Sequence, residues 1–507
     1  MEAAEDRFPN GVASGDPWPD RVVLWTRVPS EEPVELTWRV GPDPELRGGT
    51  SSGRVTADPE AGGVARVDAT GLHPGRSYFY RFETDGALSP VGRTRTLPEG
   101  PTEHLRFAVF SCSKYAAGYF NALGRIADRD DIDFVLCLGD YIYEYGNQDR
   151  GLGAEIGRAF EPDHRCATLE DYRTRYAQAR RDPEMRRMHA RHPIIAIPDD
   201  HEVADNRWRA GAKKHDDGRQ GDWESRWEAG MRAWMEWLPA RLPRSGDPRH
   251  LYRSFHLGDL ADLILLDSRT NRDRQAEPPE TERPERTLLG RRQLEWYGDQ
   301  LMRSRASWRL VANQVMVSQV ESDLLPDEVE DPLAEISVIG GHHTVSPDHW
   351  DGYPGERERV LRAIRKMGIA DTVFLAGDVH SAWACDLKFD AHDAEDDSVA
   401  VEFVTTSATS ENLDDHTGWG YRTRSPEIEH QIVEENPHIH WCELDSHGYL
   451  LVDVTADRVQ SDWYFVDTVH RPSEGIRFAE SFTVRRGEHR LRRVGEPVGP
   501  IPEPAHV

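Results

Sequence analysis

The sequence lacks long hydrophobic runs, has little cysteine, and carries far more negative than positive charge. No stretch approaches the ~20 continuous apolar residues of a membrane-spanning helix. The five cysteines are odd in number, widely spaced and without a CxxC pair, which argues against a disulfide framework or a zinc ribbon. A net charge of −28 argues against a binder of duplex DNA or RNA, which needs basic stripes to displace counterions. An anionic ligand would therefore need a strong local positive charge, such as bound metal ions.

The start of the chain also lacks the features of a secretion signal. The segment MEAAEDRFPNGVASGDP has no basic region followed by an apolar core. This pattern is compatible with a protein that stays in the cytoplasm and with a mature form from which a signal has been trimmed, and the sequence leaves both open.

The pattern of apolar runs and turn residues divides the chain into three parts. Residues 1–98 contain short alternating runs, such as RVVLWTRV and SYFYRFET, separated by Pro, Gly and Asp. This spacing predicts an N-terminal β-sandwich of the fibronectin or immunoglobulin kind. From residue 105, apolar strand-like runs alternate with Arg/Glu-rich helical stretches, for example 167–192, which predicts an α/β domain over 105–485 and leaves a C-terminal tail at 486–507.

Polar clusters directly follow five of the apolar runs. They are Ser111-Cys112-Ser113, Gly139-Asp140-Tyr141-Ile142-Tyr143, Asp199-Asp200-His201-Glu202, Asn313-Gln314 and Gly377-Asp378-Val379-His380. In open α/β sheets the ligand crevice lies at the C-terminal ends of the strands, so these clusters are expected to converge. Each alone has an ordinary structural reading, as a turn, a helix cap or a core residue. Five such coincidences at strand ends are harder to explain, and we interpret them as one site.

The donor types in these clusters favour a pair of different metal ions. Magnesium alone needs neither thiol nor imidazole, whereas a thiolate and a phenolate suit iron, and carboxylate and amide oxygens suit a second, harder ion. Asp140 is placed to bridge the two. Two ions ~3.5–4 Å apart form the clamp used for in-line phosphoryl displacement by a hydroxide generated on a metal ion. His201 is a candidate to stabilise the transition state or to protonate the leaving alkoxide.

The ordered motifs GVASGDPWPDRVVLWTRV, SCS, GDYIYEY, DDHEVADN, NQVM and GDVHS resemble the PhoD-type alkaline phosphatases and phosphodiesterases. These are distant relatives of the purple acid phosphatase and calcineurin-like metallophosphoesterases. The resemblance covers roughly residues 8–470. It implies a four-layer α/β/β/α metallophosphoesterase core as the catalytic domain and a dinuclear or trinuclear centre of Fe³⁺ plus Ca²⁺, with other divalent ions as alternatives. Members of the family are usually exported by a twin-arginine signal, which this sequence does not show.

The same resemblance implies a role for each candidate residue. The implied metal ligands are Cys112, Asp140, Tyr143, Asp200, Asn313, Asp378 and His380. Among them, Cys112 and Tyr143 would bind iron and Asp140 would bridge the ions. His201 and Asp140 would be catalytic, and His201 and Asn206 would face the substrate phosphate. The segment 436–454 resembles a family segment near the mouth of the site. Its histidines, His438, His440 and His447, either touch substrate or metal or belong to an edge strand.

We therefore expect a phosphoric ester hydrolase acting on a small phosphomonoester or phosphodiester. Three alternatives stay open: a phospholipase-D-type phosphodiesterase acting on phospholipids, a mononuclear metal hydrolase of non-phosphate esters, and a non-catalytic binding protein with a degenerate core. Loss of two or more of Cys112, Asp140, Asp200 and His380 would have favoured the binding protein, and all four are present.

Overall fold

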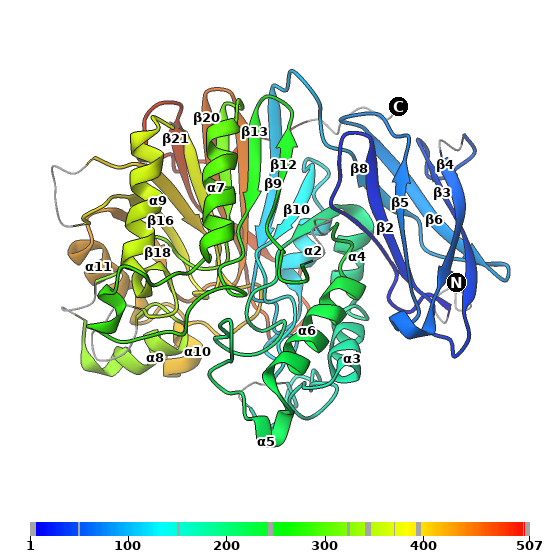
Figure 1. Ribbon diagram of the computed structural model, residues 1–507, viewed down its shortest axis with the longest axis horizontal. Helices are drawn as coiled ribbons and strands as arrows, with labels where there is room; N and C mark the ends of the chain where they lie inside the picture. The colour runs from blue at the N-terminus through cyan, green and yellow to red at the C-terminus, as the bar shows by residue number, and fades with distance from the viewer. Residues whose placement is uncertain are drawn as a thin grey trace.

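The computed structural model describes residues 7–48, 51–149, 153–241, 247–321, 325–339, 346–369, 371–391, 397–499 and 501. Two large sheets form the centre of this part of the chain (Figure 1). The larger has the strand order β22 (Leu491–Arg493), β21 (Ile476–Arg485), β20 (Arg458–Val466), β19 (Gly448–Thr455), β9 (His104–Phe110), β10 (Phe134–Cys137), β11 (Pro193–Ala196), β1 (Val12–Gly15), β2 (Arg21–Arg27) and β5 (Val64–Thr70). Its neighbours β9, β10, β11 and β1 are parallel.

The second large sheet has its own parallel centre. Its order is β12 (Arg253–Leu257), β13 (Ala261–Leu265), β14 (Trp308–Ala312), β15 (Thr372–Ala376), β17 (Ala400–Val404), β16 (Ala382–Leu387) and β18 (Ile439–Glu443). Strands β13, β14, β15 and β17 run parallel, and β12, β16 and β18 pair antiparallel. Each parallel group ends in polar clusters of the kind expected from the sequence.

Helices cover the outer faces of the two sheets. The longer ones are α2 (Asn121–Ala127), α3 (Leu169–Ala179), α4 (Pro183–Arg191), α6 (Trp223–Trp237), α7 (Arg291–Arg303), α9 (Pro354–Lys366) and α11 (Ser425–Glu435). Shorter segments are η1 (Pro59–Ala61), α5 (Asp217–Gln220), η2 (Glu280–Glu282), η3 (Asp327–Val329), α8 (Glu330–Glu335), η4 (Trp350–Gly352) and α10 (Leu413–Thr417). The predicted helical stretch 167–192 is two helices, because Asp182 caps a new helix that starts at Pro183.

Alternating side chains of the second sheet show the order of the layers. Leu310 and Val373 join a core with strands of the larger sheet, whereas their neighbours Val311 and Phe374 pack with α7 and α9. Successive residues of a strand point to opposite faces, so the second sheet is covered by the larger sheet on one face and by helices on the other. Figure 1 shows α7 and α9 side by side over that face. Indole N–H groups also cross between the sheets: Trp463 donates to the carbonyl of Val404 over 2.9 Å.

Helices α2, α4 and α6 pack on the remaining outer face. Ile126, Met188 and Trp227 belong to the same core as the strands of the larger sheet. The tryptophans of α6 are buried in this core, with Trp234 fully inaccessible. The predicted four-layer helix–sheet–sheet–helix core is thus confirmed. None of the helices in the described residues combines the length and hydrophobicity needed to cross a bilayer.

The predicted N-terminal β-sandwich is present and is joined to the core by backbone hydrogen bonds. Its outer sheet has the order β4 (Ser51–Ala57), β3 (Val34–Gly41), β6 (Ser77–Thr84) and β7 (Ala87–Leu88), and β8 (Gly92–Arg95) pairs with β6. This sheet packs on β2 and β5 around Trp38 and Tyr80. Strands β2 and β5 are at the same time the end of the larger sheet, because β1 pairs in parallel with β11.

Candidate metal centre

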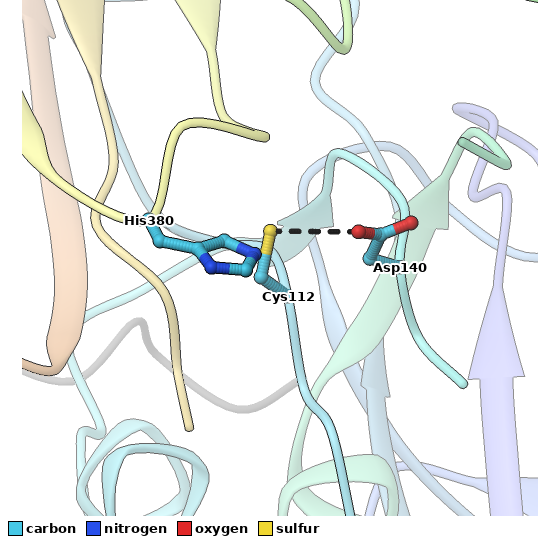
Figure 2. A group of neighbouring side chains, drawn as sticks. All are labelled: Cys112, Asp140 and His380. Carbon is cyan, nitrogen blue, oxygen red and sulfur yellow. Dashed lines mark hydrogen bonds between the residues drawn. The ribbon is translucent and has the colours of Figure 1, made fainter. Parts of the chain in front are cut away.

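The candidate ligands lie just beyond the ends of parallel strands. Cys112 follows β9 by two residues, Asp140 follows β10 by three, and Asp378 follows β15 by two. Figure 2 shows Cys112, Asp140 and His380 turned toward one another, although they come from three different segments. The Sγ atom of Cys112 lies 3.7 Å from Oδ2 of Asp140. The convergence expected from the strand-end pattern is therefore present in space.

The backbone at these positions is strained. Cys112, Asp140, Asn206, Asp378 and His380 all have φ between 47° and 69°, in the left-handed region that non-glycine residues rarely adopt. Each such residue costs on the order of 1–2 kcal/mol, and the cost is borne only where surrounding contacts fix the conformation. The concentration of these conformations at the candidate ligands indicates that the chain is shaped here to aim side chains.

Asp140 is the shared member of three candidate ligand groups. Within each group the donor atoms lie within 4.8 Å of one another. The groups are Cys112, Asp140 and His380; Asp140, Asp200 and His201; and Asp140, Asp199, Asp200 and Asp378. All but His380 are buried. Because Asp140 belongs to all three groups, the buried clusters adjoin one another, as in a multinuclear metal site.

The chemistry of these residues fits bound cations. Burial, together with the carboxylates of Asp200 and Asp199, raises the pKa of Asp140 well above its ordinary value. Burial likewise raises the pKa of the Cys112 thiol and the Tyr143 phenol. The Oδ1 atom of Asp200 is buried and accepts no hydrogen bond from the described residues. Metal ions would satisfy this oxygen and offset the crowded negative charge.

Tyr143 and His380 complete the thiol-bearing side of the centre. The Tyr143 hydroxyl donates to Oδ2 of Asp140 over 2.9 Å and lies 3.2 Å from Nε2 of His380. The other ring nitrogen of His380, Nδ1, is 2.8 Å from the carbonyl of Glu411, which fixes the tautomer that leaves Nε2 unprotonated toward the centre. Burial lowers the pKa of His380 to about 4, and the neutral ring is the form that binds metals.

His201 is held by a carboxylate that the sequence reasoning did not select. Its Nδ1 lies 2.7 Å from Oε2 of the fully buried Glu144, whose Oε1 accepts the backbone N–H of Asp205 over 3.0 Å. Burial alone would lower the pKa of His201, but the carboxylates of Asp200, Asp140 and Glu144 raise it well above its ordinary value. Glu144 lies within the GDYIYEY motif, four residues after Asp140. This closeness to a candidate ligand could have identified Glu144 as a site residue.

Arg269 and His349 were also missed. Arg269 is fully buried and contacts Asp199, Asp348 and Asp378. His349 Nε2 lies 3.0 Å from Oδ2 of Asp378. Arg269 follows strand β13 in the run ADLILLDSR, so the strand-end rule applied to this strand would have found it. His349 directly precedes η4, a position to which the strand-end pattern does not apply.

Two of the predicted site residues have different surroundings. Asn206 lines the cavity and its backbone N–H donates to Asp200 Oδ2. Asn313 is fully buried beyond β14, where its Oδ1 accepts from Trp350 Nε1 over 3.1 Å and its Nδ2 donates to the Leu375 carbonyl. It is absent from the cavity lining found among the described residues.

The three histidines of the segment 436–454 have hydrogen-bond or ion-pair partners other than the candidate ligands. His438 Nε2 lies 2.9 Å from the carbonyl of Gln319, and His440 pairs with Asp386. His447 lies 3.0 Å from the Ser407 hydroxyl. In the described part of the chain, none of the three lines the cavity at the metal centre.

The centre opens into a cavity of about 430 Å³. Acidic, aromatic and basic side chains line it together, among them Asp140, Tyr143, Asp200, His201, Asp378, His380, Tyr145, Lys114, Lys213 and Lys214. Lys114 is buried, with its Nζ 2.6 Å from Oε1 of Glu411. The cavity thus offers amino groups near a cluster of metal-type ligands, in a chain whose net charge is strongly negative.

Comparisons with known proteins agree with this arrangement. The family model described as PhoD-like phosphatase matches residues 107–463, and that described as PhoD-like phosphatase, N-terminal domain, matches residues 1–98. The chain is 35% identical over 511 residues to alkaline phosphatase D of Bacillus subtilis (strain 168), covering 96% of this chain and 82% of that protein. A solved structure titled "Structure of PhoD" superposes with a TM-score of 0.84 at 34% identity, covering 97% of this chain and 93% of that one.

The fold, the buried ligand groups and these relatives define a phosphoric ester hydrolase with a metal-binding centre. Within that class, the chain belongs to the PhoD-like phosphatase family, N-terminal domain included.

Proposed function

We propose that this enzyme is a metal-dependent phosphoesterase that hydrolyses phosphomonoesters or phosphodiesters at the centre around Asp140. The observation that carries the proposal is the membership of Asp140 in three overlapping ligand groups, each with donor atoms within 4.8 Å. A single-ion site would not need a carboxylate shared in this way. The 35% identity to an alkaline phosphatase D supports the same reaction class.

The donor set supports two different ions. The thiol of Cys112, the phenol of Tyr143 and the imidazole of His380 suit an iron ion. The carboxylates of Asp200 and Asp378 suit calcium or another divalent ion. Asn313 is left out of this assignment because its side-chain amide bonds to Trp350 and Leu375.

Metal ions held by these residues would supply Lewis-acid activation of water and would neutralise charge on the phosphate oxygens. The protein orients the groups around them. Glu144 accepts a hydrogen bond from Nδ1 of His201, and in the protonated imidazolium Nε2 carries the second proton, which is available to the leaving oxygen. The His201 ring is fixed between two aromatic side chains, stacked on Tyr143 at 4.1 Å and edge-on to Tyr145 at 5.0 Å.

The cavity supports a small, polar ester as the substrate. Lys114, Lys213 and Lys214 line it and supply positive charge toward a phosphate group. Its volume of about 430 Å³ exceeds that of a phosphate ion and leaves room for the alcohol part of the ester.

The proposal is tested by replacing Asp140 with alanine. We expect Asp140→Ala to lose bound metal and turnover of chromogenic phosphate mono- and diesters, measured by elemental analysis and by hydrolysis at defined metal concentrations. A matched control is Asp453→Ala, which removes an equally buried carboxylate that pairs with Arg106 away from the centre. The control should keep its metals. Near-normal turnover of Asp140→Ala would contradict the bridging role, and one ion per wild-type chain would favour a mononuclear hydrolase.

A further inference from the structure

Arg269 places a permanent positive charge among the acidic side chains of the metal centre. Its side chain is completely inaccessible to solvent. Nε and Nη2 contact the two oxygens of Asp199, Nη1 contacts Asp348, and Nη2 donates to Oδ1 of Asp378 over 2.7 Å. The same Nη2 lies 3.7 Å from Oδ1 of Asp200. One guanidinium thus touches or approaches three of the four carboxylates in the acidic ligand group.

Asp378 is held through both of its oxygens. Arg269 binds Oδ1 over 2.7 Å, and Nε2 of His349 lies 3.0 Å from Oδ2. The residue also has a left-handed backbone, with φ of 69°. A carboxylate fixed at both oxygens on such a backbone has one orientation, and that orientation brings it to Asp140 and Asp200.

Arg269 is itself fixed from the opposite side. Asp348, which it contacts through Nη1, also accepts from Arg272 Nη2 over 2.8 Å and from Gln275 Nε2 over 2.6 Å. The cluster of Asp348, His349 and Asp378 has metal-ligand spacing, but the Arg269 guanidinium already joins its two carboxylates. This arrangement indicates that the cluster orients Asp378 at the metal centre and is not a separate ion site.

Resting on the metal-dependent function proposed above, we propose that Arg269 and His349 are positioning residues for the second, oxygen-ligated metal ion. They hold Asp378 and Asp199 in the orientation that faces Asp140 and Asp200. The guanidinium charge also offsets part of the repulsion among these carboxylates before the ion binds. Removing outer partners of metal ligands typically costs about 10–100-fold in metal affinity. The iron-side group of Cys112, Asp140 and His380 shares only Asp140 with the acidic group, so the effect should be selective.

The test measures metal binding by Arg269→Lys directly. Lysine keeps the charge but cannot form the fork that reaches Asp199, Asp348 and Asp378 together. We expect Ca²⁺ affinity, titrated by calorimetry into the iron-loaded protein, to fall about 10–100-fold. The iron content and the tyrosinate-to-iron absorption should be retained. The control is Arg180→Lys, which alters another fully buried arginine that contacts the Trp237 and Asn10 carbonyls. It should bind Ca²⁺ as the wild type does.

Wild-type Ca²⁺ affinity in Arg269→Lys would overturn the positioning role. If wild-type protein binds no second ion, the proposed metal centre fails instead, so the two failures are distinguishable. His349→Ala provides a second test that leaves the buried charge in place. Loss of the bond to Asp378 Oδ2 should lower Ca²⁺ affinity about 10-fold, again with iron retained. An unchanged Ca²⁺ affinity in His349→Ala would show that His349 is not a positioning residue. It would also show that the contact at Oδ2 of Asp378 is not needed for metal binding.

Discussion

Replacing Glu144 by glutamine removes the negative charge that faces His201 and keeps the size of the side chain. Glu144 is fully buried, with Oε2 2.7 Å from the imidazole and Oε1 accepting the Asp205 N–H. Burial alone would raise the pKa of Glu144, but the charge and hydrogen bond of His201 lower it to about 2, from an ordinary value of 4.5. The Glu144 carboxylate is therefore expected to be ionised throughout the working pH range.

The stability effect follows from the two pKa values. The difference between 4.5 and about 2 corresponds to ~3 kcal/mol at about 1.4 kcal/mol per pH unit. Because the folded-state pKa is the lower one, charged Glu144 stabilises the fold above about pH 4.5. That contribution is lost as the pH falls toward 2. Glu144→Gln should therefore unfold ~3 kcal/mol more easily at pH 7, and the difference should shrink in acid.

Catalysis should fall in the same variant. General acid–base groups contribute about 10²–10⁴ in rate, and an imidazole without its carboxylate partner is less well oriented and less readily protonated. We expect kcat for a chromogenic phosphodiester to drop about 100-fold, with the metal content unchanged because Glu144 is outside the candidate ligand groups of the described residues.

Denaturant unfolding of the metal-free protein at pH 7 and pH 4, together with steady-state kinetics of the loaded enzyme, measures both effects. The control is Glu443→Gln: Glu443 is also buried, but burial raises its pKa to about 7, so neutralising it should cost little at pH 7. If Glu144→Gln matched wild type in both unfolding free energy and kcat, the assignment of Glu144 as the partner that orients His201 would be wrong.

Three further outcomes are expected at the centre. Cys112→Ser should weaken iron binding while leaving the far-ultraviolet circular dichroism unchanged; full iron retention would show that the thiol is not a ligand. Tyr143→Phe should abolish the tyrosinate-to-iron absorption of iron-loaded protein, and a persisting band would assign the colour to another group. Chelation should lower the unfolding temperature, since a bound ion at 1,000 times its dissociation constant stabilises by ~4 kcal/mol; an unchanged temperature would exclude tightly bound metal in the folded state.

The grouping of most candidate ligands could be predicted from the sequence because they all follow parallel strands. Parallel strands end at a common edge, so Cys112, Asp140, Asp200 and Asp378 could be placed together from local patterns alone. Asn313 follows the same rule in sequence, yet its amide bonds to Trp350 and Leu375. A strand-end position fixes where the backbone goes, whereas the side chain turns toward whichever partner the tertiary packing provides.

The supporting residues were harder to predict for a related reason. Arg269 contacts Asp199 and Asp348, which are 70 and 79 positions away in the sequence. The position of Arg269 after β13 could have drawn attention to it, but a local pattern does not show which carboxylates an arginine contacts. The pairing of β1 with β11, which extends the larger sheet into the N-terminal sandwich, likewise joins segments about 180 residues apart and leaves no local pattern.

The most direct test of a shared centre is anomalous diffraction from crystals of the metal-loaded wild-type enzyme. We expect at least two anomalous peaks flanking the Asp140 carboxylate, one beside Cys112 and Tyr143 and one beside Asp200 and Asp378. A single peak, or two peaks of which neither touches Asp140, would contradict it.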